Sequence, residues 1–414
     1  MLTPLSILLT AYPLLWFLGL DGFAWMVLLP VGGLLTFKQR TPISPRLFAF
    51  ILGCTLLVAG AIVAAFWIEE RVRYLTWFRD LYLIMTLVVV TWYLANCESE
   101  RLQSRILKPI ASILLFSCLL GVLAITFSDT LNHETPAASM MPDILAATDF
   151  GRRLVNKQIA TEGYFAGEPY LRLSGTFDYA TSYGAVLASF CVYVLAGWVS
   201  FSGSRIRWVL AGMMPIVLFN LAYTTARTSI LALYLGILTM AMLWGNTRTR
   251  ILLGLLVVGC AIALVPLLTE LILLRGEGSA TVRFEIYQRT AEAIAAHPLG
   301  YGSQTDVEDL RFPLGSHSTW LALPYKYGVV GSLGMILILL SLFRNRIFGV
   351  QHVNVQAAAL SVALFTIAIF EELYLDAMGG LVIACLLGAA LAEHRISSRQ
   401  PETHTDSRPV VRQC

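Results

Sequence analysis

The sequence predicts an all-α integral membrane protein with about twelve transmembrane helices, and two observations carry this prediction. First, 57% of the 414 residues are hydrophobic, 13% are charged, and the mean hydropathy is +0.71. In soluble proteins about a quarter of the residues are charged. Second, the hydrophobic residues fall in runs of roughly 16 to 23 residues between short charged clusters, as membrane-spanning helices do. This pattern excludes a soluble enzyme, a nucleic-acid-binding protein and a disordered chain.

Twelve hydrophobic runs define the expected helices, of which the first two are short. They are, to within about four residues, residues 5–20, 23–37, 47–67, 75–96, 109–127, 178–200, 208–225, 228–245, 251–273, 318–343, 353–370 and 373–392. The N-terminal run lacks a basic segment before it and a small-residue cleavage site after it, so we interpret it as the first span rather than a signal peptide.

Lys and Arg residues orient these helices, because the cytoplasmic loops of membrane proteins are enriched in them. With twelve spans, sixteen of the 29 Lys and Arg residues fall in connections on one side of the membrane. They are Lys38, Arg40, Arg46, Arg101, Arg105, Lys108, Arg205, Arg207, Arg248, Arg250, Arg344, Arg346, Arg395, Arg399, Arg408 and Arg412. We therefore expect both termini in the cytoplasm.

The opposite side holds two long connections, residues 128–177 and 274–317, each with six acidic and four basic residues. Connections of this length in a compact bundle usually serve a function. The expected organisation is five helices in 1–127, a loop in 128–177, four helices in 178–273, a loop with a short helix in 274–317, three helices in 318–392 and a disordered cytoplasmic tail in 393–414.

Several catalytic signatures are absent from the sequence. It contains no GxxxxGK[ST] phosphate loop, no GxGxxG after a strand, no HExxH, no DxD pair and no CxxC. Six of the seven cysteines lie inside or at the end of hydrophobic runs. We therefore expect no metal site, no cofactor and no disulfide framework.

Arginines on the non-cytoplasmic side are the first functional candidates. Arg227 stands between two hydrophobic runs, where a guanidinium either anchors the helix at the interface or binds a phosphate in a bidentate manner. Arg283 and Arg289 lie on a helix expected over 281–296, which ends before Pro298 and Gly300. Six residues of helix correspond to about 240°, so only one of these two arginines can face a pocket. We expect the other to be solvated or salt-bridged, as Arg289 would be with Glu285 or Glu292.

His317 stands where the second loop returns into the membrane, at the expected depth of Arg227. An imidazole at this position can take a proton from a hydroxyl near neutral pH. Ser318 can supply a hydroxyl, and Lys326 is expected to pair with a carboxylate or a lipid phosphate. The other two loop histidines, His133 and His297, are interpreted as structural.

Three further groups are weaker candidates. Arg172 precedes the sixth span, where exposed backbone N–H groups can bind an anion. Arg79 and Asp80 are adjacent in the fourth span and are expected to point in different directions within a structural ion-pair network. The acidic residues 371, 372 and 376, between the last two spans, are interpreted as a solvated turn.

Four segments in series resemble the O-antigen ligase and O-antigen polymerase superfamily of bacterial inner-membrane glycosyltransferases, over about residues 170–345. They read RLSGTFDYATSYGAVLA, ARTSILALYLGIL, VRFEIYQRTAEAIAAHPLGYGS and HSTWLALPYKYGVVGSLG. One departure is that the family often has His-Asn where this chain has His317-Ser318. A serine lacks the two-sided hydrogen bonding of an amide.

The resemblance implies a GT-C-like fold and a periplasmic active site that needs neither a metal nor a nucleotide. It implies a donor glycan carried on undecaprenyl diphosphate and a lipid A-core or other glycan acceptor, with membrane lipids and other polysaccharide-assembly proteins as further partners. It assigns the diphosphate to Arg227 and Arg283 and the acceptor hydroxyl to His317, with Arg172, Arg289, Lys326 and Ser318 as secondary candidates.

The sequence leaves the choice between a ligase and a polymerase open. A single histidine at the return into the membrane, followed by a glycine-rich span, favours a ligase. Arg152 with Gly163 and Arg289 with Gly300 have equal spacing, which resembles polymerases. A multi-span transporter fits the composition less well, because it requires no long outer loops and no internal repeat is visible. A structural assembly partner would not explain why Arg227, Arg283 and His317 lie at one depth.

Overall fold

The computed structural model describes a mostly helical protein. The described residues are 2–32, 44–97, 102–142, 149–165, 168–198, 205–244, 278–307, 310, 312–343, 353–373 and 376–397. The helices of the hydrophobic runs are α1 (Leu2–Leu18), α2 (Asp21–Ala24) with η1 (Trp25–Val27), α4 (Pro45–Ala65), α5 (Arg71–Ala95), α6 (Leu102–Phe127), α9 (Ala180–Ala196), α10 (Arg205–Thr224), α11 (Arg227–Trp244), α14 (Thr319–Phe343), α15 (Val355–Phe370) and α16 (Ala377–Ser397).

Within the described ranges, eleven of the twelve predicted runs contain a helix, and the run 251–273 lies outside those ranges. Five of these helices, α4, α5, α6, α10 and α14, are long and apolar enough to cross a membrane. The other six runs form shorter apolar helices. The sequence therefore predicted the helical membrane class correctly, while twelve spans remain a prediction.

The first long loop contains strands, which the all-α prediction did not include. β1 (Asn132–Glu134) pairs antiparallel with β2 (Asn156–Gln158), and β3 (Ala160–Phe165) pairs antiparallel with β4 (Glu168–Leu173). The loop also contains η2 (Pro136–Met140) and α8 (Asp149–Val155). Strands of three to six residues are too short for their alternation to stand out from loop sequence.

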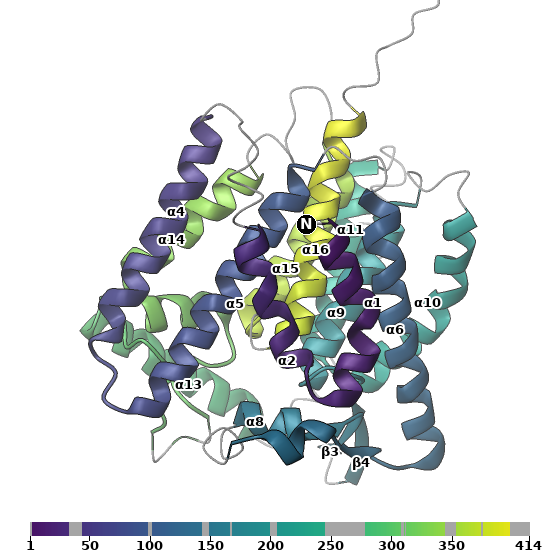
Figure 1. Cartoon of the computed structure of the whole chain (residues 1–414), viewed down its shortest axis with the longest axis horizontal. Coiled ribbons are helices and arrows are strands. Elements are labelled where there is room, and N and C mark those ends of the chain that lie inside the picture. Colours follow the sequence, from purple (N-terminus) through teal and green to yellow (C-terminus); the bar gives the residue numbers. More distant parts are fainter. Residues whose placement is uncertain are drawn as a thin grey trace, which may run out of the picture.

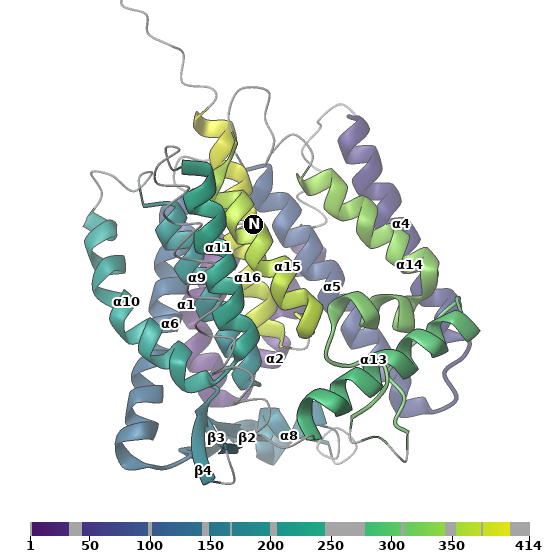
Figure 2. The ribbon, with the colours of Figure 1, turned by 180° about the vertical axis from the view of Figure 1, so that it is seen from behind.

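The elements of both long loops lie at one end of the bundle. The strands and α8 occupy the lower end in Figure 1, together with α13 (Gly278–Ala296) from the second loop. The turned view in Figure 2 shows the same arrangement, and in both views α1 begins and α16 ends toward the opposite end. This arrangement agrees with the predicted orientation, in which both termini share one side and both long loops share the other.

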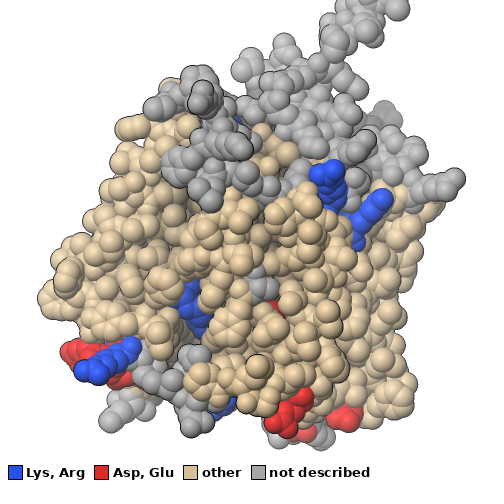
Figure 3. Space-filling model, in the orientation of Figure 1, with Lys and Arg blue, Asp and Glu red and all other residues tan. Residues whose placement is uncertain are grey.

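α9 forms the centre of the bundle and is buried along nearly its whole length. It packs against α10, α11, α15 and α16, while α16 also packs against α5. The face shown in Figure 3 is mainly uncharged, with most of its charged side chains toward the two ends. Many large hydrophobic side chains on the helices are exposed, for example Phe48, Trp208 and Leu340. Such exposed apolar side chains are suited to lipid rather than water.

Glycines bring α4 and α14 into close contact. A Cβ on Gly60 would lie 2.4 Å from the nitrogen of Gly331, and one on Gly53 would lie 2.7 Å from the oxygen of Gly334. Small residues at facing positions allow two membrane helices to approach closely. The two helices therefore form a tightly packed pair.

α14 has a kink at Gly328, where φ is +66°. The HPLGYG segment of the second loop bonds to the backbone at this kink: Tyr301 N donates to Tyr325 O at 2.8 Å and Gly302 N donates to Lys326 O at 2.9 Å. Val329 N donates in turn to Pro298 O at 2.9 Å. Broken helical backbone within a membrane protein must find such partners in the protein. The HPLGYG segment therefore fixes the second loop to the helix that follows it.

Candidate active site

His317 occupies a strained position immediately before α14. Its φ is +63°, which a residue with a side chain seldom adopts and which costs of order 1–3 kcal/mol. Tyr287 on α13 donates a hydrogen bond of 2.8 Å to the carbonyl oxygen of His317, and the ring of Phe312 packs edge-on against the imidazole. These contacts hold the ring in place. Its Nε2 atom is buried, and no hydrogen-bond partner for it occurs among the described residues.

Arg283 lies one helical turn before Tyr287, so α13 presents both side chains to His317. Burial, and secondly the charge of Arg283, lower the pKa of His317 to about 4. The imidazole is therefore neutral at physiological pH. A neutral ring with a free Nε2 can accept a hydrogen bond from a hydroxyl group.

Glu371, directly after α15, is the carboxylate partner of Arg283, with 3.8 Å between Arg283 Nη2 and Glu371 Oε1. Burial raises the pKa of Glu371 to about 7, although the charges of Arg283 and Arg172 act in the opposite direction. The carbonyl oxygen of Glu371 also accepts hydrogen bonds from Thr319 N and Thr319 Oγ1, at 3.2 and 2.8 Å. The α15–α16 connection is thus fixed to the segment that carries His317.

Arg172 reaches the same region from the first loop. It lies on β4, and its Nε donates a hydrogen bond of 2.8 Å to the carbonyl oxygen of Thr224 at the end of α10. Arg227 follows three residues later as the exposed first residue of α11. α11 packs along α15, which ends beside Glu371. The structure therefore brings Arg172, Arg283 and His317 together around Glu371, with Arg227 at the adjoining helix start.

The remaining sequence candidates have other partners. Arg289 forms an ion pair of 2.6 Å with Glu285, as predicted, and both side chains are largely exposed. Ser318 is buried, with its Oγ 3.5 Å from the carbonyl oxygen of Ala368 on α15. Lys326 is 1% exposed and pairs with two carboxylates, which confirms the expectation of a carboxylate partner.

The buried ion pairs correct two expectations. Arg79 and Asp80 do not point in different directions, because Arg79 Nη2 lies 2.7 Å from Asp80 Oδ1. Asp80 and Glu372 lie 2.9 and 3.3 Å from Lys326 Nζ, so the expected ion-pair network is present. The α15–α16 connection is not a solvated turn, since Glu372 and Asp376 are 4% and 3% exposed. Glu372 accepts hydrogen bonds from Lys326 on α14 and from Gln304 of the second loop. Asp376 accepts hydrogen bonds from the backbone nitrogens of Asp178 and Gly379.

Sequence reasoning therefore missed Glu371 and Tyr287 as parts of the site. One signal for Glu371 was available: two glutamates directly follow an apolar run with no polar residue between. No sequence signal identified Tyr287, whose contact depends on how α13 packs against the loop.

The sequence was compared with models of known protein families. Residues 212–336 match the family model described as O-antigen ligase. This match supports an assignment to the O-antigen ligase and polymerase superfamily. The matched region contains Arg227, Arg283, His317 and the HPLGYG segment. No match was found among curated proteins.

Members of this superfamily are glycosyltransferase-like enzymes. The match and the apolar helices together support a multi-pass membrane protein of polysaccharide biosynthesis. In such an enzyme, the guanidinium groups of this site can bind an anion, and a neutral imidazole lies beside them. Within the described ranges, no group of three or more His, Cys, Asp or Glu side chains is placed to hold a metal ion.

Proposed function

We propose that this protein is an O-antigen ligase-like glycosyltransferase of the bacterial inner membrane. It moves a glycan from undecaprenyl diphosphate to a sugar hydroxyl of a lipid A-core or similar acceptor at the periplasmic face. The observation that carries this proposal is the placement of Arg283 beside His317. Arg283 on α13 offers a group that binds an anion, and His317 before α14 offers a group that can take a proton. Tyr287, also on α13, connects the two segments through its hydrogen bond to the carbonyl oxygen of His317.

In the proposed reaction, Arg283 and Arg227 bind the diphosphate of the donor. The acceptor hydroxyl gives its proton to Nε2 of His317 while its oxygen attacks the anomeric carbon of the donor sugar. The bond from that carbon to the diphosphate oxygen breaks, and the electron pair leaves with undecaprenyl diphosphate. Arginine charge stabilises this leaving group, which is the role a cation plays in other transferases. Arg172 is proposed to assist in binding the diphosphate, because it lies beside Glu371.

A polymerase of the same superfamily is the alternative, favoured by the equal spacing of Arg152 with Gly163 and of Arg289 with Gly300. A transfer assay tests the proposal and separates the two. Purified protein is given lipid-linked glycan, either with a lipid A-core acceptor or alone. Glycan on the core supports the ligase, and elongation on the polyprenyl carrier alone supports the polymerase. No transfer of either kind, in a preparation that binds the donor, would reject both.

A further inference from the structure

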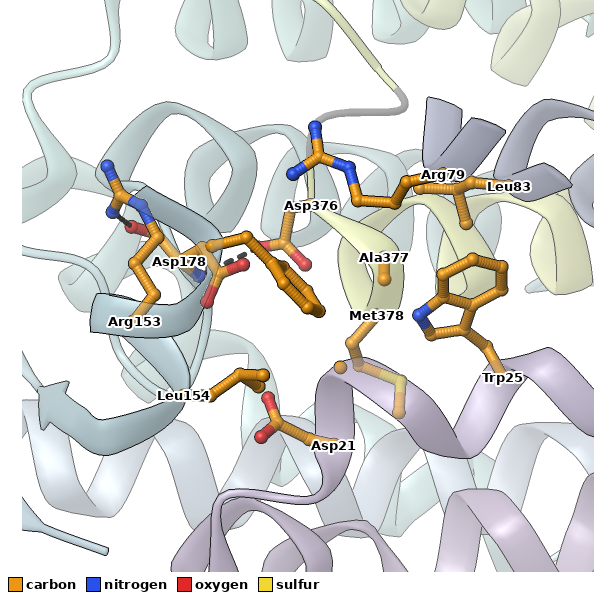
Figure 4. Close-up of a pocket in the computed structure, with 12 residues that line it drawn as sticks. Asp21, Trp25, Arg79, Leu83, Arg153, Leu154, Asp178, Asp376, Ala377 and Met378 are labelled. Carbon is orange, nitrogen blue, oxygen red and sulfur yellow. Dashed lines mark hydrogen bonds between the residues drawn. The ribbon is translucent and has the colours of Figure 1, made fainter. Parts of the chain in front are cut away.

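A second polar pocket lies at the same end of the molecule, outside the Arg283–His317 site. Its inner part is a cavity of about 20 Å³ between η1, α5, α8 and the start of α16. Figure 4 shows Asp21 and Trp25 on one side of it and Arg79 and Asp376 on the other. About one water-sized group fits into this volume.

Three buried atoms of side chains that line this cavity have no hydrogen-bond partner among the described residues. They are Oδ1 of Asp21, Nε1 of Trp25 and Nε of Arg153, and the first two residues are 7% and 1% exposed. The other oxygen of Asp21 is already paired with Lys157, at 2.9 Å. Buried polar atoms rarely stay unpaired in folded proteins. At the inner cavity, the acceptor of Asp21 and the donor of Trp25 therefore lack a partner within the part of the chain that the structure describes, and a group that both donates and accepts would satisfy them. Arg153 lines both the cavity and the adjoining cleft.

The inner cavity adjoins a larger cleft of about 390 Å³, and both are lined by Arg153 and Asp178. The cleft also has Trp16, Arg152 and Lys157 in its walls. A volume of this size is in the range of small-molecule sites. The inner end is lined by the carboxylates of Asp21, Asp178 and Asp376 together with Arg79 and Arg153. It therefore offers both acceptors and donors, rather than the mainly cationic lining that suits a diphosphate.

A hydroxyl group fits this mixture of donors and acceptors, because it donates one hydrogen bond and accepts others. We infer that the cleft and its inner cavity form a binding subsite for one sugar unit of the glycan, with a sugar hydroxyl inserted between Asp21 and Trp25. This inference rests on the proposed function, since it names where the transferred or accepting glycan is held.

The location supports this role. Asp376 at the inner cavity and Glu371 at the Arg283–His317 site stand on one short connection. Five residues of chain span at most about 18 Å, so a single glycan chain can occupy both places. Asp376 also accepts a hydrogen bond of 2.9 Å from Asp178 N, which fixes the connection to the wall of the cleft.

The test uses full-length protein and glycans freed from their carriers. Oligosaccharide released from the lipid-linked donor and oligosaccharide released from lipid A-core are titrated separately by calorimetry. Wild-type protein is expected to bind at least one of them, and the one that binds identifies the glycan held. Trp25→Phe, which keeps an aromatic ring but removes the N–H group with the five-membered ring of the indole, should weaken that binding roughly 3- to 10-fold. Arg152→Ala, at an exposed residue in the wall of the cleft, should weaken it as well.

Trp92→Phe is the matched control, because Trp92 is also buried but lies on α5 outside both cavities. It should leave affinity unchanged. Binding of glycan-free undecaprenyl diphosphate should be the same in all three variants. If neither oligosaccharide binds, or if Trp25→Phe and Arg152→Ala bind as the wild type does, the three atoms bond only to water and the inference is wrong. Absence of transfer by the wild type would instead reject the proposed function.

Discussion

Arg283 and Arg289 are the same residue type on the same helix, yet the structure gives them different surroundings. Arg283 faces His317 and Glu371, whereas Arg289 pairs with Glu285 on the exposed side of α13. The helical period predicted that only one of these two positions could face a pocket, and the family resemblance selected Arg283.

Substitutions at these two arginines test the assignment of the diphosphate. Arg283→Ala should reduce donor affinity by roughly 10- to 150-fold, since a hydrogen bond to a charged group contributes about 1.5–3 kcal/mol. Arg283→Lys should restore only part of it, because a lysine cannot bind two oxygens with a planar fork. Affinity is measured with purified protein and lipid-linked donor. Arg289→Ala is the matched control and should stay within about twofold of wild type. A strong effect of Arg289→Ala with a weak one of Arg283→Ala would reverse the assignment.

Glu371 makes donor binding sensitive to pH. Its pKa is raised to about 7 by burial, and the charged groups that face it are Arg283, Arg172 and Glu372. Ionised Glu371 competes with a diphosphate for Arg283, whereas protonated Glu371 does not. Donor affinity should therefore fall as pH rises, by up to about 10-fold between pH 6 and pH 8 for one linked proton.

Glu371→Gln should bind donor at pH 8 about as tightly as wild type does at pH 6. The donor affinity of this variant should lose most of its pH dependence. Any pH dependence that remains is due to titration of the diphosphate itself. Equal pH profiles for wild type and variant would show that Glu371 does not compete for Arg283.

At the scale of elements, α14 carries a buried charge that links three helical segments. Lys326 pairs with Asp80 on α5 and with Glu372 after α15, and Gln304 of the second loop donates a 2.7 Å hydrogen bond to Glu372. The sequence predicted a carboxylate partner for Lys326. It could not identify which carboxylate, because the partners lie 246 and 46 residues away and meet only after the helices pack.

Lys326→Met should destabilise the protein by about 3–5 kcal/mol, because it leaves the buried Glu372 without a cation and Asp80 with Arg79 alone. The measurement is unfolding in detergent, followed by the loss of helical signal with heat or denaturant. Lys108→Met on α6 is the control, since Lys108 is exposed and should change stability by less than about 1 kcal/mol. Equal stability of the two variants would mean that the Lys326 network contributes little to folding.

The HPLGYG segment shows a second limit of sequence reasoning. The expected end of α13 before Pro298 and Gly300 is correct, since the helix ends at Ala296. The bonds from this segment to the kinked backbone of α14 were not predicted. They depend on a positive φ at Gly328, and a glycine in a run gives no indication of which conformation it adopts.

At the scale of the whole molecule, composition and charge placement predicted the helical membrane class, and both long loops lie at one end as expected. The short strands and the buried acidic connection were not predicted, because both depend on contacts between distant segments. Orientation in a membrane is still a prediction, since it rests on the distribution of Lys and Arg.

Cysteine labelling in whole cells tests that orientation. In a background without the seven native cysteines, exposed positions such as Ser139 on η2 and Ala291 on α13 are replaced by cysteine. Both should react with a membrane-impermeant maleimide added from the periplasm. Cysteine at Arg105, near the opposite end of α6, should react only after the inner membrane is opened. Protection of Ala291→Cys in intact cells would contradict the twelve-span orientation.

The central claim, that Arg283 holds the donor while His317 takes the acceptor's proton, is tested most directly by measuring donor binding and glycan transfer on the same preparations. His317→Ala should keep the wild-type donor affinity and lose at least about 100-fold in transfer rate, the lower range for a positioned general base. Because the pKa of His317 is about 4, it stays neutral above about pH 5, and the wild-type rate at saturating donor should fall only at lower pH. A chelator should leave this rate unchanged. Loss of donor binding in His317→Ala, or near-wild-type transfer by His317→Gln, which cannot take up the proton, would contradict the claim.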